Sequence, residues 1–405
     1  MNIIFLGKFY PQTLITTLAT DSKGKAGMSN HNFEMSLING LCQQNDITLR
    51  CITAPSVYSF PYNNRRFFTR RESYQYKNTH IYSVGFCNLP VIKEIWSTIA
   101  LILNLAKVFS QYEGDKVDVI INTPNNGLLN AVRFAKLFTR KKITKTVIIP
   151  DIPSMVTSMD KQNKLKGLLL KHRNERSMKM TSKSDGLVLL TEAMMDFVNK
   201  PVPYIVMEGI VDVESMWGES RPPTKEIILY TGTLRKIFGV LNLVQAFQKI
   251  KDKDVELWIC GSGDSENAIK EAANVDSRIK FYGLVDSQTA LKMQRQATIL
   301  VNPRTSEGEY TKYSFPSKTM EYLLSGKSVI INRLPGIPKE YYQYVYTPED
   351  ESVEALVECI SNVLTTKYYD RMIKAHNGRE FVTRNKNSIV QTRRILNLIK
   401  GYTVV

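Results

Sequence analysis

The chain has 405 residues, of which 43% are apolar and 23% charged, and its formal net charge at pH 7 is +16. This length predicts two domains, each with its own core, and the composition excludes a protein that is disordered over long stretches. The five cysteines and four histidines lack the spacing of metal ligands. The sequence therefore argues against a metal cluster or a disulfide framework and favours a reducing compartment.

The positive charge is concentrated in the first half of the chain. Residues 1–205 contain 27 Lys and Arg against 14 Asp and Glu, whereas the remaining residues contain 27 against 24. A basic half predicts an anionic partner, either a nucleic acid or the headgroups of a membrane. We interpret the short apolar run at the start, Asn2–Gly7, as a strand and not as a signal peptide.

A polar loop around Gly27 follows this strand and leads into an apolar-periodic helix. Such a loop can cradle a phosphate or an acceptor sugar, but an ordinary connection between strand and helix fits the pattern equally well. Tyr58–Lys77 then interleaves arginines with aromatic residues. This composition is typical of surfaces that bind single-stranded nucleic acid or a membrane interface, and a solvated surface loop is the alternative.

Val91–Phe109 is the most apolar helix that the sequence predicts. Its apolar stretch is shorter than the roughly 20 residues that a membrane span requires. We therefore interpret it as a buried or interfacial helix, and we favour a position in the core over one that faces a membrane. A second basic patch lies within Arg133–Lys145. Asp151 follows a predicted strand, Lys145–Pro150, at the end where open α/β sheets bind ligands, and a helix cap or turn is an equally good interpretation.

Strands and helices alternate from Ile227 onward, which predicts a parallel, doubly wound sheet. Glycines fall at the carboxyl ends of three of these strands, and we expect them to line one edge of the sheet: Gly232, Gly261, Gly263 and Gly283. Asp252 and Asp254 have the spacing of a metal-binding pair. They precede a strand, at the end opposite the ligand edge, so we predict a solvated turn and no metal.

The stretch from Ala297 to Leu334 carries the strongest functional signal. It predicts a strand, a polar loop, a helix over Pro316–Leu324 and a second strand, with Gly326 in the left-handed conformation that closes the helix. Ser314 or Ser317 is placed to cap this helix. A loop between a strand and a helix N-terminus can bind phosphate through free N–H groups and the helix dipole.

Lys318 and Glu321 lie three residues apart and therefore share one face of the predicted helix. A lysine near the helix start suits a diphosphate. A carboxylate one turn deeper can accept two hydrogen bonds from the vicinal hydroxyls of a ribose. A buried amphipathic helix without a ligand is the alternative, with Phe315, Met320 and Leu323 in the core.

The string FPSKTMEYLLSGKSVI, from Phe315 to Ile330, resembles the donor-site helix of GT-B glycosyltransferases of the family-four type, which build bacterial capsules, O-antigens and exopolysaccharides. The resemblance implies an α/β fold with two Rossmann-like, doubly wound parallel-sheet domains that face each other across a cleft. Residues 1–205 are then expected to bind the acceptor, with a linker at 206–225. Residues 226–385 are expected to bind a nucleotide sugar, and residues 386–405 to cross back to the first domain as a helix.

The activity that the resemblance implies is transfer of a sugar from a UDP- or GDP-linked donor to a lipid-linked or oligosaccharide acceptor, with retention of configuration. No metal and no further cofactor are expected. The basic first half fits a cytoplasmic protein that is peripheral on the anionic inner face of the cell membrane, and no nucleic acid is expected as a partner.

The resemblance also implies which residues act. Glu321 is expected to hold the ribose, and Gly283 and Leu284 to present backbone to the base. The expected donor-binding set is Gly27, Gly232, Thr233, Lys236, Gly261, Gly263, Gly283, Leu284, Ser314, Phe315, Pro316, Ser317 and Glu321. The expected catalytic set is Lys318, Arg235, Glu309 and Asp151.

The sequence departs from the family pattern at three places. Tyr313 stands where many members carry a glutamate near the transferred sugar, so Glu307 or Glu309 is expected to substitute. Pro150 replaces the histidine of a His-Asp pair, so that only Asp151 carries over. The usual basic pair after the first glycine is replaced by Thr233 and Phe238, so the positive charge is expected from Arg235, Lys236 and Lys318.

Two alternatives remain open at this point. A nucleotide-sugar 2-epimerase has the same fold, but the first half lacks clear pairs of carboxylates and histidines at strand ends for proton transfer. A non-enzymatic protein that binds nucleic acid or an anionic membrane explains the charge but not the stretch from Tyr313 to Ile330.

Overall fold

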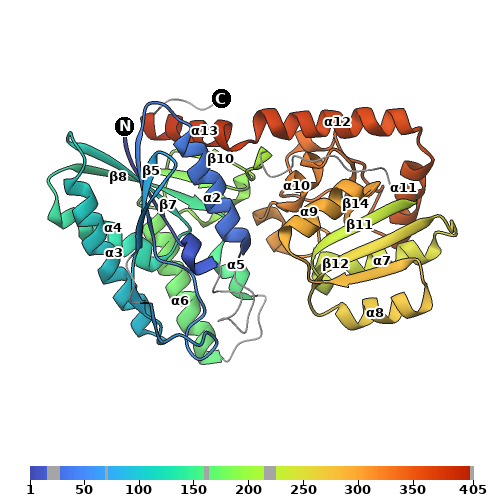
Figure 1. The fold of residues 1–405 in the computed structure, drawn as a ribbon, viewed down its shortest axis with the longest axis horizontal. Helices are drawn as coiled ribbons and strands as arrows, with labels where there is room; N and C mark the ends of the chain where they lie inside the picture. The colour runs from blue at the N-terminus through green and yellow to red at the C-terminus, as the bar shows by residue number, and fades with distance from the viewer. Residues whose placement is uncertain (16–27, 69–71, 159–163, 214–224, 402–405) are drawn as a thin grey trace. The chain divides into compact units, whose positions relative to one another are not determined.

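The structure is a computed structural model that describes residues 1–15, 28–68, 72–158, 164–213 and 225–401. It contains two compact units: unit 1 comprises Met1–Ile210 and Ser388–Val405, and unit 2 comprises Val211–Asn387 (Figure 1). The chain therefore passes between the units twice, after Ile210 and after Asn387. The sequence places the linker at residues 206–225 and the start of the returning helix at residue 386.

Unit 1 is built on a parallel sheet that has one antiparallel edge strand. The strand order is β10-β9-β8-β7-β1-β2-β5-β4, and of these eight strands β4 alone runs antiparallel to its neighbour. β4 and β5 are joined by Lys77 and Asn78, and so short a connection can join only antiparallel strands. The bounds are β1 (Asn2–Gly7), β2 (Thr48–Thr53), β4 (Glu72–Tyr76), β5 (Thr79–Ser83), β7 (Lys116–Asn122), β8 (Lys142–Ile149), β9 (Gly186–Leu189) and β10 (Tyr204–Val206).

The basic and aromatic segment Tyr58–Lys77 supplies this edge of the sheet. Besides β4 it forms β3 (Phe67–Phe68), which pairs with β6 (Phe86–Cys87). Tyr62 and Phe67 remain exposed. The interpretation as a solvated loop is therefore wrong for both strands, although part of the aromatic surface does face solvent.

Helices cover both faces of this sheet. α3 (Ile92–Ser110), α4 (Asn126–Ala135) and α6 (Lys164–Thr181) follow one another, with α3 packed on α4 and α4 on α6 (Figure 1). α5 (Pro153–Ser158) precedes α6. α2 (Met28–Cys42) packs on the last helix, α13 (Ser388–Lys400), which also contacts β9 and β10. Ile395 and Leu396 of α13 are buried in the same apolar cluster as Val188 and Ile205.

α3 is buried on one face only, so the preference for a position in the core is wrong for its other face. The inner face is buried, including Leu101 and Leu105, but five large apolar side chains on the outer face are 46–59% exposed: Ile92, Ile95, Trp96, Ile99 and Leu103. Both faces of the helix are apolar, so its sequence periodicity does not reveal which one the sheet covers. Within the described parts of the chain, no helix combines the length and hydropathy needed to cross a membrane.

Unit 2 has the parallel, doubly wound sheet that the sequence predicts. All five strands are parallel, in the order β13-β12-β11-β14-β15. They are β11 (Glu226–Thr233), β12 (Val255–Ser262), β13 (Ile279–Gly283), β14 (Ile299–Asn302) and β15 (Ser328–Ile331). The helices are α7 (Val240–Lys249), α8 (Glu266–Val275), α9 (Ser287–Gln296), α10 (Lys318–Leu324), α11 (Val353–Thr365) and α12 (Tyr368–Asn385). Asp252 Oδ1 accepts a hydrogen bond from Asp254 N, so this pair forms the predicted turn.

The start of α10 differs from the prediction. The helix begins at Lys318 and not at Pro316, and Ser317 takes the cap position without a side-chain hydrogen bond. The hydroxyl of Ser314 instead lies 3.5 Å from Arg304 Nη1, as a hydrogen-bond acceptor. The end of the helix is as predicted, because Gly326 has a φ of +68°.

The close contact between α2 and α13 generates a prediction about stability. A Cβ atom at Gly40 of α2 would lie 2.1 Å from the carbonyl oxygen of Ser388 and 2.9 Å from Thr392 Cγ2. We expect Gly40→Ala to destabilise unit 1 by about 1–3 kcal/mol in denaturant unfolding, because the contact outweighs the gain in helix propensity. Gly167→Ala in α6 is the matched control: nothing lies within 4 Å of its Cβ position. An equally harmless Gly40→Ala would contradict the packing of α13 on α2.

Candidate functional site

The carboxyl edge of the unit 2 sheet brings the strand-end glycines together. Gly232 of β11 lies in register with Gly261 of β12, and Gly283 ends the next strand. At Gly261, where φ is +143°, a Cβ atom would lie 1.7 Å from the carbonyl oxygen of Gly232. At Gly263 it would lie 2.4 Å from the carbonyl oxygen of Leu234. The approach of the chain that leaves β11 is therefore sufficient to explain both of these glycines.

Lys318, the first residue of α10, extends over Gly232. A Cβ atom at Gly232 would lie 2.5 Å from Lys318 Cε and 3.3 Å from its Nζ. Burial raises the pKa of the Cys260 thiol to about 11, and the positive charge of Lys318 partly offsets this rise. The ammonium group is thus held at the ends of β11 and β12.

Glu321, one turn along α10, is held by a buried network. Gln294 of α9, which is fully buried, donates from Nε2 to Glu321 Oε1 and also to Thr231 Oγ1, at 3.1 Å. The N–H of Thr231 donates to Tyr322 OH at 3.0 Å. The second carboxylate oxygen of Glu321 makes no hydrogen bond with the described residues. One oxygen is therefore fixed while the other can accept a hydrogen bond from a ligand.

Arg304 is a cation of this edge that the sequence analysis did not single out. It follows β14, and although it is only 7% exposed its Nε has no partner among the described residues. The guanidinium lies over two aromatic rings, 5.5 Å from the centroid of Phe238 and 4.7 Å from that of Tyr310. Phe238 is the position where the family pattern has a lysine. Arg304 therefore places a positive charge beside Phe238, the position that lacks the lysine of the family pattern.

Tyr230 connects Arg304 to the Lys318 side of the site. Burial raises the pKa of its phenol, and the positive charge of Arg304 opposes that rise. Its hydroxyl donates to the carbonyl of Thr233 at 2.8 Å and would lie 3.1 Å from a Cβ atom at Gly232. Tyr230 and Lys318 therefore both lie beside Gly232, and these three residues together with Arg304 are here called the polar cluster.

The remaining predicted residues are less central to this cluster. Arg235 is half-buried and engaged in an interaction, Thr233 and Lys236 are exposed, and Lys236 N donates to Asp264 at 2.9 Å. Gly283 has a φ of +66° with open space at its Cβ position, and Leu284 beside it is 63% exposed.

Several residues that the sequence predicts for the site are instead buried in the core or exposed to solvent. Phe315 and Pro316 are buried, and the ring of Phe315 packs against Tyr341 with 5.3 Å between centroids. Glu307 and Glu309 are both exposed, and neither carboxylate bonds to the described residues. Tyr313 is buried. The structure therefore does not bring Glu309 into the polar cluster through a hydrogen bond.

In unit 1, Asp151 is exposed two residues beyond the carboxyl end of β8, while Gly27 lies outside the described residues. The best-organised polar group at this sheet edge is Glu34 of α2. Its Oε2 accepts hydrogen bonds from the N–H groups of Lys8 and Phe9 at 2.8 and 3.0 Å, and Asn122 donates to its Oε1 at 2.9 Å. The signal for this residue was present in the sequence, because Glu34 is the one acidic residue of α2.

Glu34 explains why the first strand ends in glycine. A Cβ atom at Gly7 would lie 2.0 Å from Glu34 Oε2, so a side chain at this position would displace the carboxylate. Glu34 is 2% exposed, and burial raises the pKa of its carboxyl group to about 7 against the hydrogen bonds that favour its charged form. Burial also lowers the pKa of the neighbouring Lys8 and of His31, whose Nδ1 accepts a hydrogen bond from Tyr10 N.

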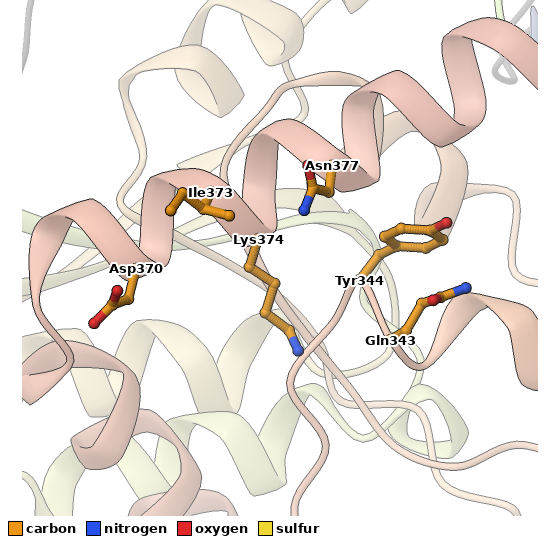
Figure 2. A pocket seen from close by; sticks show the side chains of 6 residues that line it. All are labelled: Gln343, Tyr344, Asp370, Ile373, Lys374 and Asn377. Atoms are coloured by element: carbon orange, nitrogen blue, oxygen red, sulfur yellow. The ribbon is translucent and has the colours of Figure 1, made fainter.

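Two hollows in the described structure lie apart from the Lys318 cluster. One, of about 300 Å³, opens beyond the carboxyl ends of β1, β2 and β5 in unit 1 and is lined by Pro11, Thr13, Leu14, Pro55, Arg65, Phe67, Phe68, Glu72, Ser83, Val84 and Phe86. The other, of about 340 Å³, lies in unit 2 between one face of α12 and the chain near Gln343 and Tyr344 (Figure 2). It shares no residue with the polar cluster, and Lys374 in its wall lies 4.9 Å from the ring centroid of Tyr346.

Comparison with known proteins identifies what this arrangement resembles. Residues 225–366 match the family model of the group 1 glycosyl transferases. WcaI of Escherichia coli (strain K12), a predicted colanic acid biosynthesis glycosyl transferase, is 25% identical over 191 residues, which is 44% of this chain and 44% of WcaI. The chain therefore matches less than half of this curated relative.

The whole chain is similar in fold to solved structures. Sucrose-phosphate synthase from Thermosynechococcus elongatus has a TM-score of 0.64 at 14% identity, with 99% of each chain covered. HepE of Anabaena in complex with UDP has a TM-score of 0.63 at 12% identity, with 99% of this chain and all of HepE covered. These structures confirm the predicted GT-B fold. The family model and WcaI confirm the resemblance to GT-B glycosyltransferases of the family-four type over the part of the chain that they match.

The buried carboxyl of Glu34 generates a prediction about pH. Its pKa is about 7 in the folded protein against an ordinary 4.5, so between these values the folded protein retains a proton that the unfolded chain has released. Stability is therefore lost as the pH rises from 4.5 to 7, by about 3 kcal/mol for this group. Glu34→Gln keeps an oxygen for the two backbone donors and should abolish this loss, measured as the free energy of unfolding against pH. Glu175→Gln, at an exposed position of α6, is the control. A pH profile that is identical in all three proteins would contradict the burial of an ionisable group here.

Proposed function

We propose that the protein is a glycosyltransferase that moves a sugar from a nucleoside-diphosphate donor, held by unit 2, to an acceptor in the synthesis of a surface polysaccharide or lipopolysaccharide. The observation that carries this proposal is the placement of Lys318 over Gly232, with Glu321 one helical turn away on the same face. The diphosphate of a donor requires a cation, which Lys318 would provide. The ribose attached to it requires a hydrogen-bond acceptor, which Glu321 would provide.

The cluster supports a role for positive charge in the reaction. When the bond from the anomeric carbon to the donor phosphate breaks, negative charge develops on the departing diphosphate. Lys318 and Arg304 would stabilise that charge, and preorganised charges in a water-poor site are effective because they need not reorganise during the reaction. The acceptor hydroxyl forms the new bond to the anomeric carbon and gives its proton to the diphosphate. Retention of configuration is part of the proposal.

UDP is the proposed nucleotide of the donor. HepE of Anabaena, which shares the fold, has been solved with UDP and with UDP-glucose. In this chain, Gly283 and Leu284 would face the base, because the space at Gly283 is open and Leu284 is exposed. The acceptor is proposed to be lipid-linked or an oligosaccharide. The protein would then work at the cytoplasmic face of an anionic membrane, with unit 1 as the part that meets lipid.

Nucleotide binding tests the donor site directly. We expect UDP or a UDP-sugar at about 100 times its dissociation constant to stabilise the protein by roughly 2.7 kcal/mol in thermal unfolding, more than GDP or ADP at the same concentration. Glu321→Ala and Arg304→Gln should each remove most of this stabilisation. Glu271→Ala and Lys280→Ala, at exposed positions of unit 2, are the matched controls. A protein that no nucleotide stabilises would refute the proposed donor site.

The contact between Gly232 and Lys318 allows a sharper test of the cation. Gly232→Ala places a methyl group 2.5 Å from Lys318 Cε, which must then move. We expect about 10²-fold lower kcat/KM for the donor, a cost typical of a displaced catalytic group. In a Lys318→Met background the same glycine substitution should cost little more, because the group that it displaces is already gone. Equal losses in both backgrounds would show that Gly232 acts through something other than Lys318.

A further inference from the structure

We propose that the outer face of α3, together with the end of α4 and the following turn η1 (Lys136–Phe138), is the surface through which unit 1 docks on an anionic lipid bilayer. This docking face rests on the proposed function, since it gives the membrane partner of that function a defined location. Its physical basis, however, is independent of the donor site in unit 2.

The first part of the docking face is a stripe along α3. Ile92, Ile95, Trp96, Ile99 and Leu103 recur at intervals of three and four residues, and each is 46–59% exposed. They extend over about 16 Å at the helical rise of roughly 1.5 Å per residue. Large apolar side chains that recur at helical spacing and face solvent mark an interaction surface, because single exposed residues do not line up in this way.

The second part lies on the neighbouring helix. α3 packs against α4, and η1 continues directly from α4 (Figure 1). Phe134, Leu137 and Phe138 are 43%, 78% and 68% exposed. The docking face therefore includes eight exposed apolar side chains on two adjacent helices.

Basic side chains accompany both parts of the docking face. Lys107 is exposed one turn after Leu103, and further exposed cations follow within and after α4: Arg133, Lys136, Arg140 and Lys142. In residues 91–110 and 126–142 the one acidic side chain is Glu94, which forms an ion pair with Arg173 at 3.2 Å. Unit 1 as a whole has 30 Lys and Arg against 15 Asp and Glu, whereas unit 2 has 24 against 23.

Exposed apolar side chains together with basic side chains indicate that the partner of the docking face is a lipid surface. A second copy of the chain would have to bring the same basic residues together, and these repel one another. An anionic bilayer instead offers negative headgroups to the cations and an apolar interior to the stripe, and an interfacial helix places a tryptophan at headgroup depth. Each Lys or Arg near such a surface strengthens binding by about fivefold, so the basic residues and the apolar stripe act together.

The first turn of α3 is anchored to the rest of unit 1. Lys93 Nζ donates to the carbonyl of Val57, which lies just beyond the carboxyl end of β2, and Glu94 pairs with Arg173 of α6. The beginning of the stripe is therefore fixed beside the sheet edge that carries Glu34 and the hollow near Phe68. Docking through α3 would bring this edge close to the membrane, within reach of a lipid-linked acceptor.

Vesicle binding by the full-length protein tests the docking face. We expect vesicles that contain phosphatidylglycerol to bind the wild type at least tenfold more strongly than vesicles of phosphatidylcholine alone, measured by co-sedimentation. The pair Ile95→Gln and Ile99→Gln, and separately the pair Lys136→Glu and Arg140→Glu, should each weaken this binding at least tenfold. The matched controls are Val275→Gln and Lys251→Glu, which alter exposed residues of unit 2.

Tryptophan fluorescence gives a second, local readout. Emission should shift to the blue on addition of anionic vesicles, and Trp96→Phe should remove this shift while retaining most of the binding. An unchanged shift in Trp96→Phe would overturn the proposed depth of α3.

The outcomes separate this inference from the proposed function. Undiminished vesicle binding by the α3 and α4 variants, or no binding by the wild type, overturns the docking face, and UDP stabilisation then still reports on the donor site. A wild-type dimer in sedimentation that Ile95→Gln and Ile99→Gln dissociate would also overturn it, in favour of a second copy. If the protein binds vesicles but no nucleotide stabilises it, the docking face is supported and the proposed glycosyltransferase function is refuted.

Discussion

The candidate site of unit 2 depends on the close approach of two backbones at the carboxyl edge of its sheet. The carbonyl oxygen of Gly232 occupies the space that a side chain at Gly261 would need, so β11 and β12 can end together only if Gly261 is glycine. That shared end leaves room above Gly232 for the side chain of Lys318. Because Gly261 has no Cβ atom, the two strands can end side by side. Because Gly232 has none, there is space for the side chain of Lys318.

Unit 1 also has an ionisable side chain beside a glycine at a strand end, in this case the buried carboxyl group of Glu34. Glu34 replaces water as the acceptor for the N–H groups of Lys8 and Phe9, directly after β1, and Gly7 leaves the space that its carboxylate needs. A buried carboxyl with three donors still has a raised pKa because desolvation exceeds the gain from the hydrogen bonds. In both units, therefore, a glycine at a strand end makes room for an ionisable side chain that comes from a helix.

The sequence was informative wherever a local pattern determines the outcome. Alternating elements predicted the parallel sheet of unit 2, and Gly326 predicted the end of α10 correctly. Prediction from the sequence failed where the structure depends on contacts between residues that are distant in the chain. Arg304 reaches Phe238 only because β14 lies beside β11, and no local signal records that proximity. The apolar pattern of α3 likewise predicted a helix but not which of its faces the sheet would leave uncovered.

The return of α13 to unit 1 has a consequence for how the chain folds during synthesis. Its side chains complete a cluster that includes Val188 and Ile205, yet they are translated only after the whole of unit 2. During synthesis, unit 2 can fold as soon as it is translated, because it is one continuous segment. Part of the apolar core of unit 1 remains uncovered until α13 has been made. This partly folded intermediate exposes apolar surface, which favours aggregation. The first-made part of the chain is thus the last to be completed, and chaperones would matter most for unit 1.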